Sequence, residues 1–306
     1  MAFVKDLYND EIRDGWLVKS DMKKVWNKQM EIWQEIDNIC RKHKITYWAG
    51  WGTLLGAVRH GGFIPWDEDF DLAMMRPDYN RFCKIIDDEL FQRSGIFEVE
   101  RKNFSVVKIA HSQTTLLALE NINNKQKPKG LAIDIFPLDV TFDGTNSSFF
   151  ALNAINELLG TVYNYPALVR HVQQGGKTVN DWSVIEELNA FKNLYDKFEF
   201  LNIYAEGLFD YSSKVDWIER FVFKRPQVFM EKSWYRKTIY LPFETVKLPA
   251  PIDYEPILTS IYGDWHKYVI DGNKRLGFVH SPDIPYREFL KLANVDFIMN
   301  KKASEK

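Results

Sequence analysis

The chain has 306 residues, a length that suits one large domain or two modest ones and allows a sizeable hydrophobic core. Its 40 Lys and Arg residues against 42 Asp and Glu residues leave a net charge of −2, which argues against non-specific nucleic-acid binding. Cys40 and Cys83 are too few for a disulfide framework or a four-thiolate zinc site, and they favour a reducing, cytosolic setting. Because neither a signal-peptide core nor an apolar run of ~20 residues is evident, we expect no secretion and no membrane span.

Regular elements are predicted along the first half of the chain. Apolar residues three or four apart predict an amphipathic helix over residues 20–44, opened by Ser20 or Asp21. A strand over 45–50 should run into a glycine turn and then into a short helix that ends at Gly61 and Gly62. Further on we expect a strand over 70–75, a helix over 77–90, a hairpin of 96–101 with 104–110, and a strand over 131–140 that Pro137 should end.

The sequence pattern changes near residue 146. Residues 146–235 are typical of helices, with a Gly-Gly break at 175 and 176, and strand-like segments return from about 236. We therefore predict a catalytic core over 1–145, a helical insertion over 146–235 as a candidate acceptor region, and a part over 236–306 that completes the core. The fold class is α/β (α+β), a mixed sheet flanked by helices, without the glycine fingerprint or regular spacing of a Rossmann fold.

One acidic cluster carries most of the chemical information. Four carboxylates fall within five residues, and a period of two would place the three aspartates on one face of an extended segment. Adjacent carboxylates repel one another, and Mg²⁺ relieves that repulsion because it takes oxygen ligands and shares them with substrate phosphates. An exposed acidic turn is the alternative, disfavoured because the flanking FDLAMM segment looks buried. The cluster consists of Asp67, Glu68, Asp69 and Asp71.

A glycine-rich turn precedes this cluster. A strand that ends in Gly-x-Gly-Thr and enters a helix presents free backbone amides and a helix N-terminus, an arrangement that suits phosphate. Thr53 adds a hydroxyl that can act as a helix cap or a phosphate donor. Glycines before a helix are a weak signal alone, but together with Asp-Phe-Asp in a later strand they predict a phosphate cradle facing a metal site.

This combination resembles the nucleotidyltransferase superfamily. The longer string GTLLGAVRHGGFIPWDEDFDLAMMRPDYNRF resembles the LicD family, which includes bacterial phosphocholine transferases and fukutin-related ribitol-phosphate transferases. The segment 133–139 is similar to the family's second block, while 262–265 and the residues Lys274, Arg275 and His280 resemble its C-terminal block more loosely. The resemblance implies a nucleotidyltransferase-like sheet core with a helical insertion, although no usable similarity to the family is evident over 146–235.

The resemblance also implies roles for particular residues. Asp69 and Asp71 would bind a metal, Mg²⁺ or Mn²⁺, and Asp134 would be the third carboxylate from a neighbouring strand; these three are the predicted catalytic residues. Asp67 would be either a direct ligand of the metal or a residue that orients one. Donor phosphates would contact Gly52 and Thr53.

Basic and aromatic residues around the motif leave alternatives open. Arg59, His60 and Arg76 could neutralise a pyrophosphate, or they could pair with the acidic cluster itself. Lys108 stands in an otherwise apolar strand and needs a counter-charge, so a phosphate or the acidic cluster suits it better than solvent. Most of the tryptophans are expected in the core, the remainder stacking on a base or holding a quaternary ammonium. The candidates are Trp48, Trp51 and Trp66, with Trp217, Trp234 and Trp265 further along the chain.

The activity that the resemblance implies is transfer of a phospho-alcohol, with phosphocholine favoured, from a CDP-activated donor to a hydroxyl, with release of CMP. The implied partners are a CDP-alcohol, CDP-choline above others, and a glycan or lipid-linked oligosaccharide acceptor such as a lipopolysaccharide or teichoic acid precursor. The implied location is cytoplasmic, at the inner face of the membrane where the acceptor is lipid-linked. Alternatives are ribitol-, glycerol- or ethanolamine-phosphate transfer, and a non-catalytic family member that binds a glycan or a nucleotide.

Overall fold

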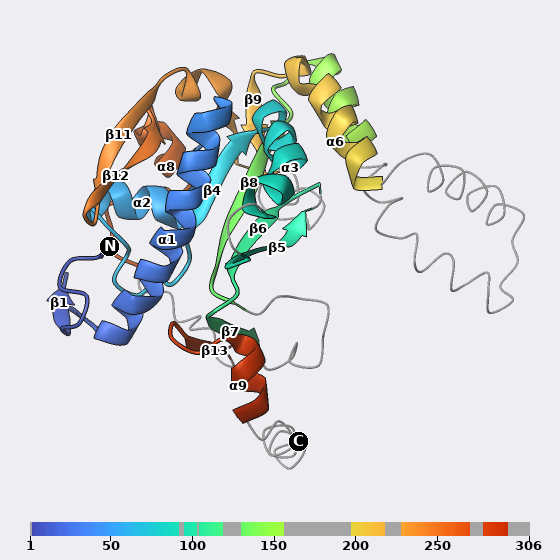
Figure 1. Ribbon diagram of the computed structural model, residues 1–306. Coiled ribbons are helices and arrows are strands. Elements are labelled where there is room, and N and C mark those ends of the chain that lie inside the picture. The colour runs from blue at the N-terminus through green and yellow to red at the C-terminus, as the bar shows by residue number, and fades with distance from the viewer. Residues whose placement is uncertain are drawn as a thin grey trace, which may run out of the picture.

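The computed structural model describes residues 2–91, 95–102, 104–118, 130–155, 197–217, 228–269 and 278–292. These residues form a mixed sheet with helices packed on it, which confirms the α/β (α+β) class (Figure 1). Most of the predicted helical insertion, including the glycine pair at 175 and 176, lies outside the described residues, as do Lys274 and Arg275. The division into three parts therefore stays a prediction.

The central sheet is built around one parallel pair of strands. β4 (Asp71–Met75) runs parallel to β8 (Ala132–Val140). On the far side of β4 lies the short antiparallel β3 (Trp48–Ala49), and the other edge of β8 is shared by β6 (Val107–His111) and β9 (Lys214–Asp216). β5 (Phe97–Lys102) extends the sheet beyond β6, which confirms the predicted hairpin, and β10 (Met230–Glu231) extends it beyond β9.

The prediction that Pro137 ends its strand is wrong. β8 continues to Val140, with Pro137 opposite Met74 of β4. On the other edge of β8, the pairing with β6 stops at Ile135 and the pairing with β9 starts at Asp139. Proline lacks an N–H and is tolerated where no ladder bond is required, and Pro137 lies in the gap between these two neighbours.

Three helices that the sequence pattern predicted pack on the sheet. α1 (Ser20–His43) buries its apolar stripe against β6 and β8, and its basic last turn complements the helix dipole. α2 (Trp51–Arg59) follows β3 directly and ends before Gly61, as expected. α3 (Arg76–Phe91) packs on α1, β4 and β8, with Pro77 in its first turn.

The remaining elements surround this core. The hairpin of β11 (Thr238–Phe243) and β12 (Val246–Pro251), followed by α8 (Tyr254–Tyr262), packs on α2 and β3. A ribbon of β7 (Thr115–Ala118) and β13 (Phe278–Ser281), with α9 (Tyr286–Leu292), lies near the end of the sheet where β8 begins (Figure 1). β1 (Glu11–Arg13) and β2 (Trp16–Val18) form an N-terminal ribbon, while α6 (Lys197–Gly207) and residues 146–155 share a small apolar cluster. None of the helices in the described ranges has the length and apolar character needed to cross a bilayer.

Arg76 joins several of these elements from inside the core. Its side chain is fully buried, and its Nε and Nη2 donate to the Asp139 carboxylate on β8 at 2.7 and 2.5 Å. Nη1 donates to Asn202 Oδ1 on α6 at 2.7 Å, and Nη2 also donates to the carbonyl of Phe104 at 2.8 Å. A buried charge needs such partners, so this pair ties the end of β4 to β8 and α6.

We predict that Arg76→Leu destabilises the protein by about 3–5 kcal/mol, because it leaves the buried Asp139 carboxylate without its counter-charge. Arg81→Leu on the same helix is the matched control. Arg81 pairs with Asp78 at an exposed site, where such a pair contributes about 0–1 kcal/mol. Urea unfolding followed by circular dichroism measures both, and equal losses for the two variants would contradict this role of Arg76.

Candidate active site

A row of three charged side chains crosses the middle of the sheet. In the pairing register, Asp71 of β4 lies opposite Asp134 of β8, and Asp134 lies opposite Lys108 of β6. Directly opposed residues in neighbouring strands point to the same face of a sheet. Asp71, Asp134 and Lys108 therefore project side by side, as the predicted third carboxylate from an adjacent strand requires.

The charges in this row are unevenly balanced. Lys108 Nζ lies 2.9 Å from Asp134 Oδ1, so the counter-charge of this lysine is the third carboxylate, opposite Asp71 of the acidic cluster. That buried oxygen accepts no hydrogen bond of good geometry from the described residues. Burial, followed by the charges of Asp69, Asp134 and Asp67, raises the pKa of Asp71 well above its usual value, while Lys108 acts in the opposite direction. One lysine thus faces several carboxylates, and the cluster favours additional positive charge.

The row opens into a cavity of about 410 Å³, counted with the solvent at its mouth. We call residues 67–70, which lead into β4, the acidic loop. Besides the row itself, the cavity wall includes Asp69 and Glu68 from this loop, Gln29 from α1 and His280 from β13. The β7–β13 ribbon thus closes one side of a chamber whose floor is the carboxylate row. Apolar residues complete the lining: Val25, Phe70, Leu116, Leu131 and Ala132.

Helix α1 holds the acidic loop in place. Trp26 Nε1 donates to the carbonyl of Asp67 at 2.9 Å, and Gln29 Nε2 donates to the carbonyl of Glu68 at 2.7 Å. Of the segment from Asp67 to Asp71 only Asp71 belongs to a strand, and before it the backbone N–H of Asp69 donates to Asp67 Oδ1 at 3.3 Å. Sequence reasoning missed Gln29, although a polar residue on the buried side of an amphipathic helix was a visible signal.

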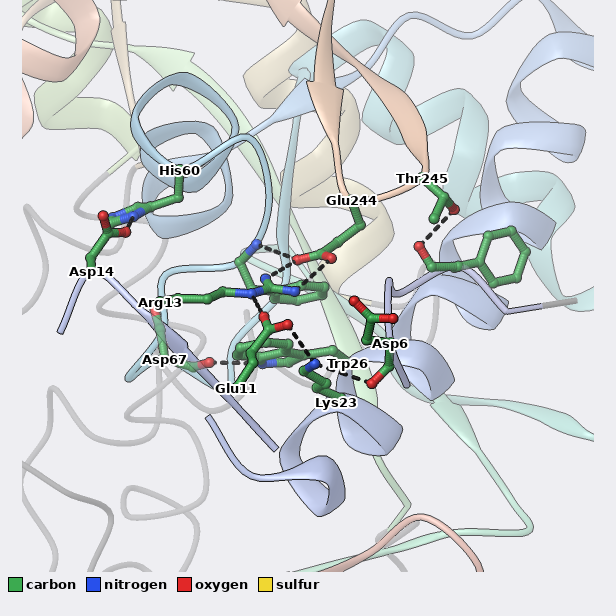
Figure 2. A network of polar contacts seen from close by, with 12 residues as sticks. Asp6, Glu11, Arg13, Asp14, Lys23, Trp26, His60, Asp67, Glu244 and Thr245 are labelled. Carbon is green, nitrogen blue, oxygen red and sulfur yellow. Dashed lines mark hydrogen bonds and ion pairs between the residues drawn. The ribbon is translucent and has the colours of Figure 1, made fainter. Parts of the chain in front are cut away.

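A second polar network adjoins Trp26 and holds the segment that leads into this loop (Figure 2). Arg13 of β1 donates to the buried Glu244 carboxylate at 2.5 and 3.0 Å and lies over the Trp26 ring. Glu244, in the turn between β11 and β12, also accepts from the backbone N–H of Phe63 at 3.3 Å. A side chain at Gly62 would overlap the Glu244 carboxylate, so this approach requires glycine. The N-terminal ribbon, the β11–β12 turn and the acidic loop are thereby held together.

The glycine turn places the start of α2 beside the cluster. The backbone N–H of Gly50 donates to the carbonyl of Asp71 at 3.0 Å, and the N–H of Asp71 donates to Thr53 Oγ1 at 2.8 Å. A Cβ at Gly52 would come within 2.9 Å of Asp67 Oδ2, so glycine there lets a carboxylate approach the helix N-terminus. The structure brings Gly52 and Thr53 to the cluster, with Thr53 locking α2 to β4 rather than capping the helix.

Arg59 and His60 lie at the other end of α2, which is about 13 Å long. Arg59 donates to the carbonyls of Trp265 and Lys267 at 2.8 and 3.1 Å, and His60 Nδ1 lies 2.6 Å from Asp14 Oδ2. Burial lowers the pKa of each of these two side chains. No contact in the described part of the chain joins either residue to the carboxylate row.

Arg76 is likewise not brought to the carboxylate row. It follows the last residue of β4, about 16 Å along the strand from Asp71, and its guanidinium is engaged by Asp139. The alternative that these basic residues pair with the acidic cluster is wrong, because each has a different partner. Their role in binding a pyrophosphate stays a prediction that this arrangement does not favour.

The residues of the row fit a divalent cation. Asp71 and Asp134 present adjacent carboxylates, Asp69 lines the same cavity, and Asp134 Oδ1 is buried without a well-aligned donor. Among the described side chains, no three His, Cys, Asp or Glu residues already form a ligand set for a metal ion. Mg²⁺ does not require such a set, because it is usually held by one or two carboxylates together with substrate phosphates.

We predict that Asp71→Asn raises the melting temperature by a few degrees in excess chelator at neutral pH. A carboxyl whose pKa is raised by folding loses stability as the pH rises through that pKa, and asparagine removes this loss. The gain should vanish below about pH 4, where aspartate is protonated in both states. Melting curves from pH 4 to 8 test this, with the exposed Asp88→Asn as control. A variant that melts below the parent protein at pH 7 without metal would contradict the repulsion.

Comparisons with known proteins match the part of the chain that contains this site. Residues 44–156, which include the glycine turn and all four aspartates, match the family model described as LicD/FKTN/FKRP, nucleotidyltransferase domain. The chain is 26% identical over 254 residues to the lipopolysaccharide cholinephosphotransferase LicD of Haemophilus influenzae, covering 75% of this chain and 85% of that protein.

Shorter similarities point the same way. A segment of 34 residues is 53% identical to the human ribitol 5-phosphate transferase FKRP, covering 11% of this chain and 7% of that protein. An uncharacterized protein of Rickettsia prowazekii is 29% identical over 104 residues, 32% of this chain and 38% of that protein. The resemblance expected from the sequence is confirmed for residues 44–156, which match the LicD family model.

Proposed function

We propose that this protein is a metal-dependent phosphotransferase that moves phosphocholine from CDP-choline to a hydroxyl of a cell-surface glycan or teichoic acid precursor, releasing CMP. The observation that carries the proposal is the row of Asp71, Asp134 and Lys108 across three neighbouring strands, in a cavity that also contains Asp69. With a lipid-linked acceptor, the enzyme would act at the inner face of the membrane.

Asp69, Asp71 and Asp134 are the proposed metal-binding residues, with Mg²⁺ or Mn²⁺ as the cation. The cation would supply positive charge to the donor pyrophosphate and to the departing CMP. Asp71 would give up its proton when the cation binds, since a nearby positive charge lowers the pKa of a carboxyl. Asp67, held against the start of α2, would orient this group of ligands.

Lys108 and the start of α2 are the proposed phosphate-binding groups. Lys108 is half-buried beside Asp134, so its ammonium can exchange that carboxylate for a phosphate oxygen at the same place. The first backbone N–H groups of α2, including those of Gly52 and Thr53, lie beside the acidic loop. A helix N-terminus favours an anion, which suits the second phosphate of the donor.

The transfer itself would be an in-line displacement. The acceptor oxygen forms a bond to the phosphorus that carries choline, and the bond from that phosphorus to the CMP oxygen breaks. Asp134 would orient the acceptor hydroxyl and take its proton, since it belongs to the row and also pairs with Lys108. CMP leaves with the electron pair of the broken bond.

The relatives favour choline over other alcohols in this proposal. The H. influenzae cholinephosphotransferase is similar over most of this chain, whereas the ribitol 5-phosphate transferase is similar over 34 residues. Ribitol, glycerol and ethanolamine phosphates stay as alternative cargoes of the same carboxylate row. A non-catalytic binding protein is the alternative of a different class. Such a protein would gain nothing from a row of carboxylates that repel one another.

We predict metal-dependent CMP release from CDP-choline, tested in a panel with CDP-ethanolamine, CDP-ribitol and CDP-glycerol and a glycan acceptor. Asp69→Ala or Asp71→Ala should lower turnover by about a thousandfold or more, because metal-assisted charge stabilisation contributes several kcal/mol. Asp88→Ala, an exposed aspartate on α3, is the matched control and should turn over normally. Full activity in excess chelator would refute the metal, and turnover of glycerol or ribitol but not choline would refute the cargo.

We also predict that the leaving nucleotide is a cytidine nucleotide. A ligand that binds only the native state raises the free energy of unfolding by mass action, by about 2.7 kcal/mol at a hundred times its dissociation constant, and the melting temperature rises with it. Thermal shift with CMP, UMP, AMP and GMP in Mg²⁺ measures this, and CMP should give the largest shift. A clear preference for a purine nucleotide would overturn the CDP-donor assignment.

A further inference from the structure

Three aromatic rings meet beside the carboxylate row. The ring centroid of Phe136 lies 4.8 Å from that of Trp51 and 4.8 Å from that of Trp217, while the two tryptophan centroids are 6.3 Å apart. The rings stand edge to face, with interplanar angles of 71°, 62° and 74° in the same order. We call these three residues the aromatic cluster.

The aromatic cluster and the carboxylate row share one face of the sheet. Phe136 follows Asp134 by two residues on β8, so both side chains point the same way, about 7 Å apart along the strand. The residue opposite Phe136 on β4 is Ala73, a small residue, and the backbone of Gly50 packs closely against Ala73. Trp51 is the first residue of α2, directly before Gly52. All three rings are partly exposed, in contrast to Ile133 and Ile135 on the opposite face of β8.

Backbone and side-chain bonds fix the two tryptophans. Trp51 has a φ of +38°, a value that a bulky residue rarely adopts and that persists only where the surrounding structure requires it. Trp217 Nε1 donates to the carbonyl of Ser105 at 3.1 Å, and its backbone N–H donates to Asp216 Oδ1 at 2.8 Å. The indole N–H of Trp217 is therefore engaged, and what this ring offers a ligand is its π-face.

We propose that the aromatic cluster binds the trimethylammonium group of the phosphocholine donor. This inference rests on the proposed function. A quaternary ammonium has no N–H to donate, so a protein holds it by ring faces and nearby negative charge. Both are present here, since Phe136 lies two residues from Asp134 and Trp51 adjoins Gly52, which Asp67 Oδ2 approaches closely. The spacing also fits, because the two-carbon linker of choline separates its nitrogen from the phosphate by a length comparable with the separation of Phe136 from Asp134.

The structure separates these rings from the other tryptophans near the motif. Trp48 is buried, donates to Thr238 Oγ1 and packs on Tyr235, as expected of a core residue. Trp66 contacts Trp16, His60 and Tyr268, towards the far end of α2. The competing occupant for the aromatic cluster is the cytosine ring of the donor, which would also stack on an aromatic face.

The test compares choline-dependent and nucleotide-dependent binding. Trp217→Leu and Phe136→Leu remove a π-face but keep apolar bulk, Trp217→Phe restores a ring, and Trp234→Phe is a half-buried control in the segment 232–235. Calorimetric titration with CDP-choline and with CMP, each in Mg²⁺, measures affinity. Steady-state kinetics with CDP-choline and CDP-glycerol measures KM and kcat separately.

The expected result is a loss of about tenfold in affinity for CDP-choline in each leucine variant, with the affinity for CMP unchanged. The KM for CDP-choline should rise with little change in kcat, Trp217→Phe should recover most of the affinity, and Trp234→Phe should match the parent protein. Parallel losses for CMP and CDP-choline would overturn the proposal in favour of the base, and unchanged affinities for both would overturn it outright. If the parent protein turns over no CDP-alcohol, the proposed function fails, while the difference between CDP-choline and CMP binding still decides the aromatic cluster.

Discussion

The structure of this site depends on the repulsion between carboxylates that the parallel pairing of β4 and β8 forces together. The register sets Asp71 against Asp134, and the acidic loop adds Asp69 and Asp67 to the same neighbourhood. Moving these carboxylates apart would relieve the repulsion. The surrounding contacts therefore have to hold them in place. Trp26 and Gln29 hold the loop from α1, Thr53 holds the start of β4, and Lys108 neutralises part of the charge. An enzyme commonly accepts such a cost in stability at the place where a substrate or cation will supply the missing charge.

The arrangement divides the surroundings of the row into two flanks. Towards the start of β8 lies the cavity, walled by Gln29 of α1 and His280 of the β7–β13 ribbon. In the other direction along β8, Phe136 leads to the aromatic cluster. Under the proposed function, the donor phosphates occupy the row, its head group the aromatic flank, and the polar cavity is left for the nucleotide or the acceptor hydroxyl.

Local patterns in the sequence predicted much of this fold, and pairing register explains most of what they missed. The periodicity of α1, the glycine turn into α2 and the strand that follows the acidic segment are local signals, and each was confirmed. Pro137 was misjudged because its tolerance depends on where β6 and β9 end, which only the sheet reveals. Arg76 looked like a phosphate ligand because it follows the motif closely, but its partner Asp139 is far along the chain. Whether two flanking residues face the same site depends on strand direction and helix length, not on their distance in sequence.

Binding of Mn²⁺ in the presence of CDP, followed by electron paramagnetic resonance, tests whether the row of carboxylates holds a cation. If Asp71 and Asp134 share one cation with the donor phosphates, the parent protein should bind Mn²⁺ and either Asp71→Asn or Asp134→Asn should lose that binding. Asp88→Asn should bind it as the parent does. Unchanged Mn²⁺ affinity in both Asp71→Asn and Asp134→Asn would contradict the account.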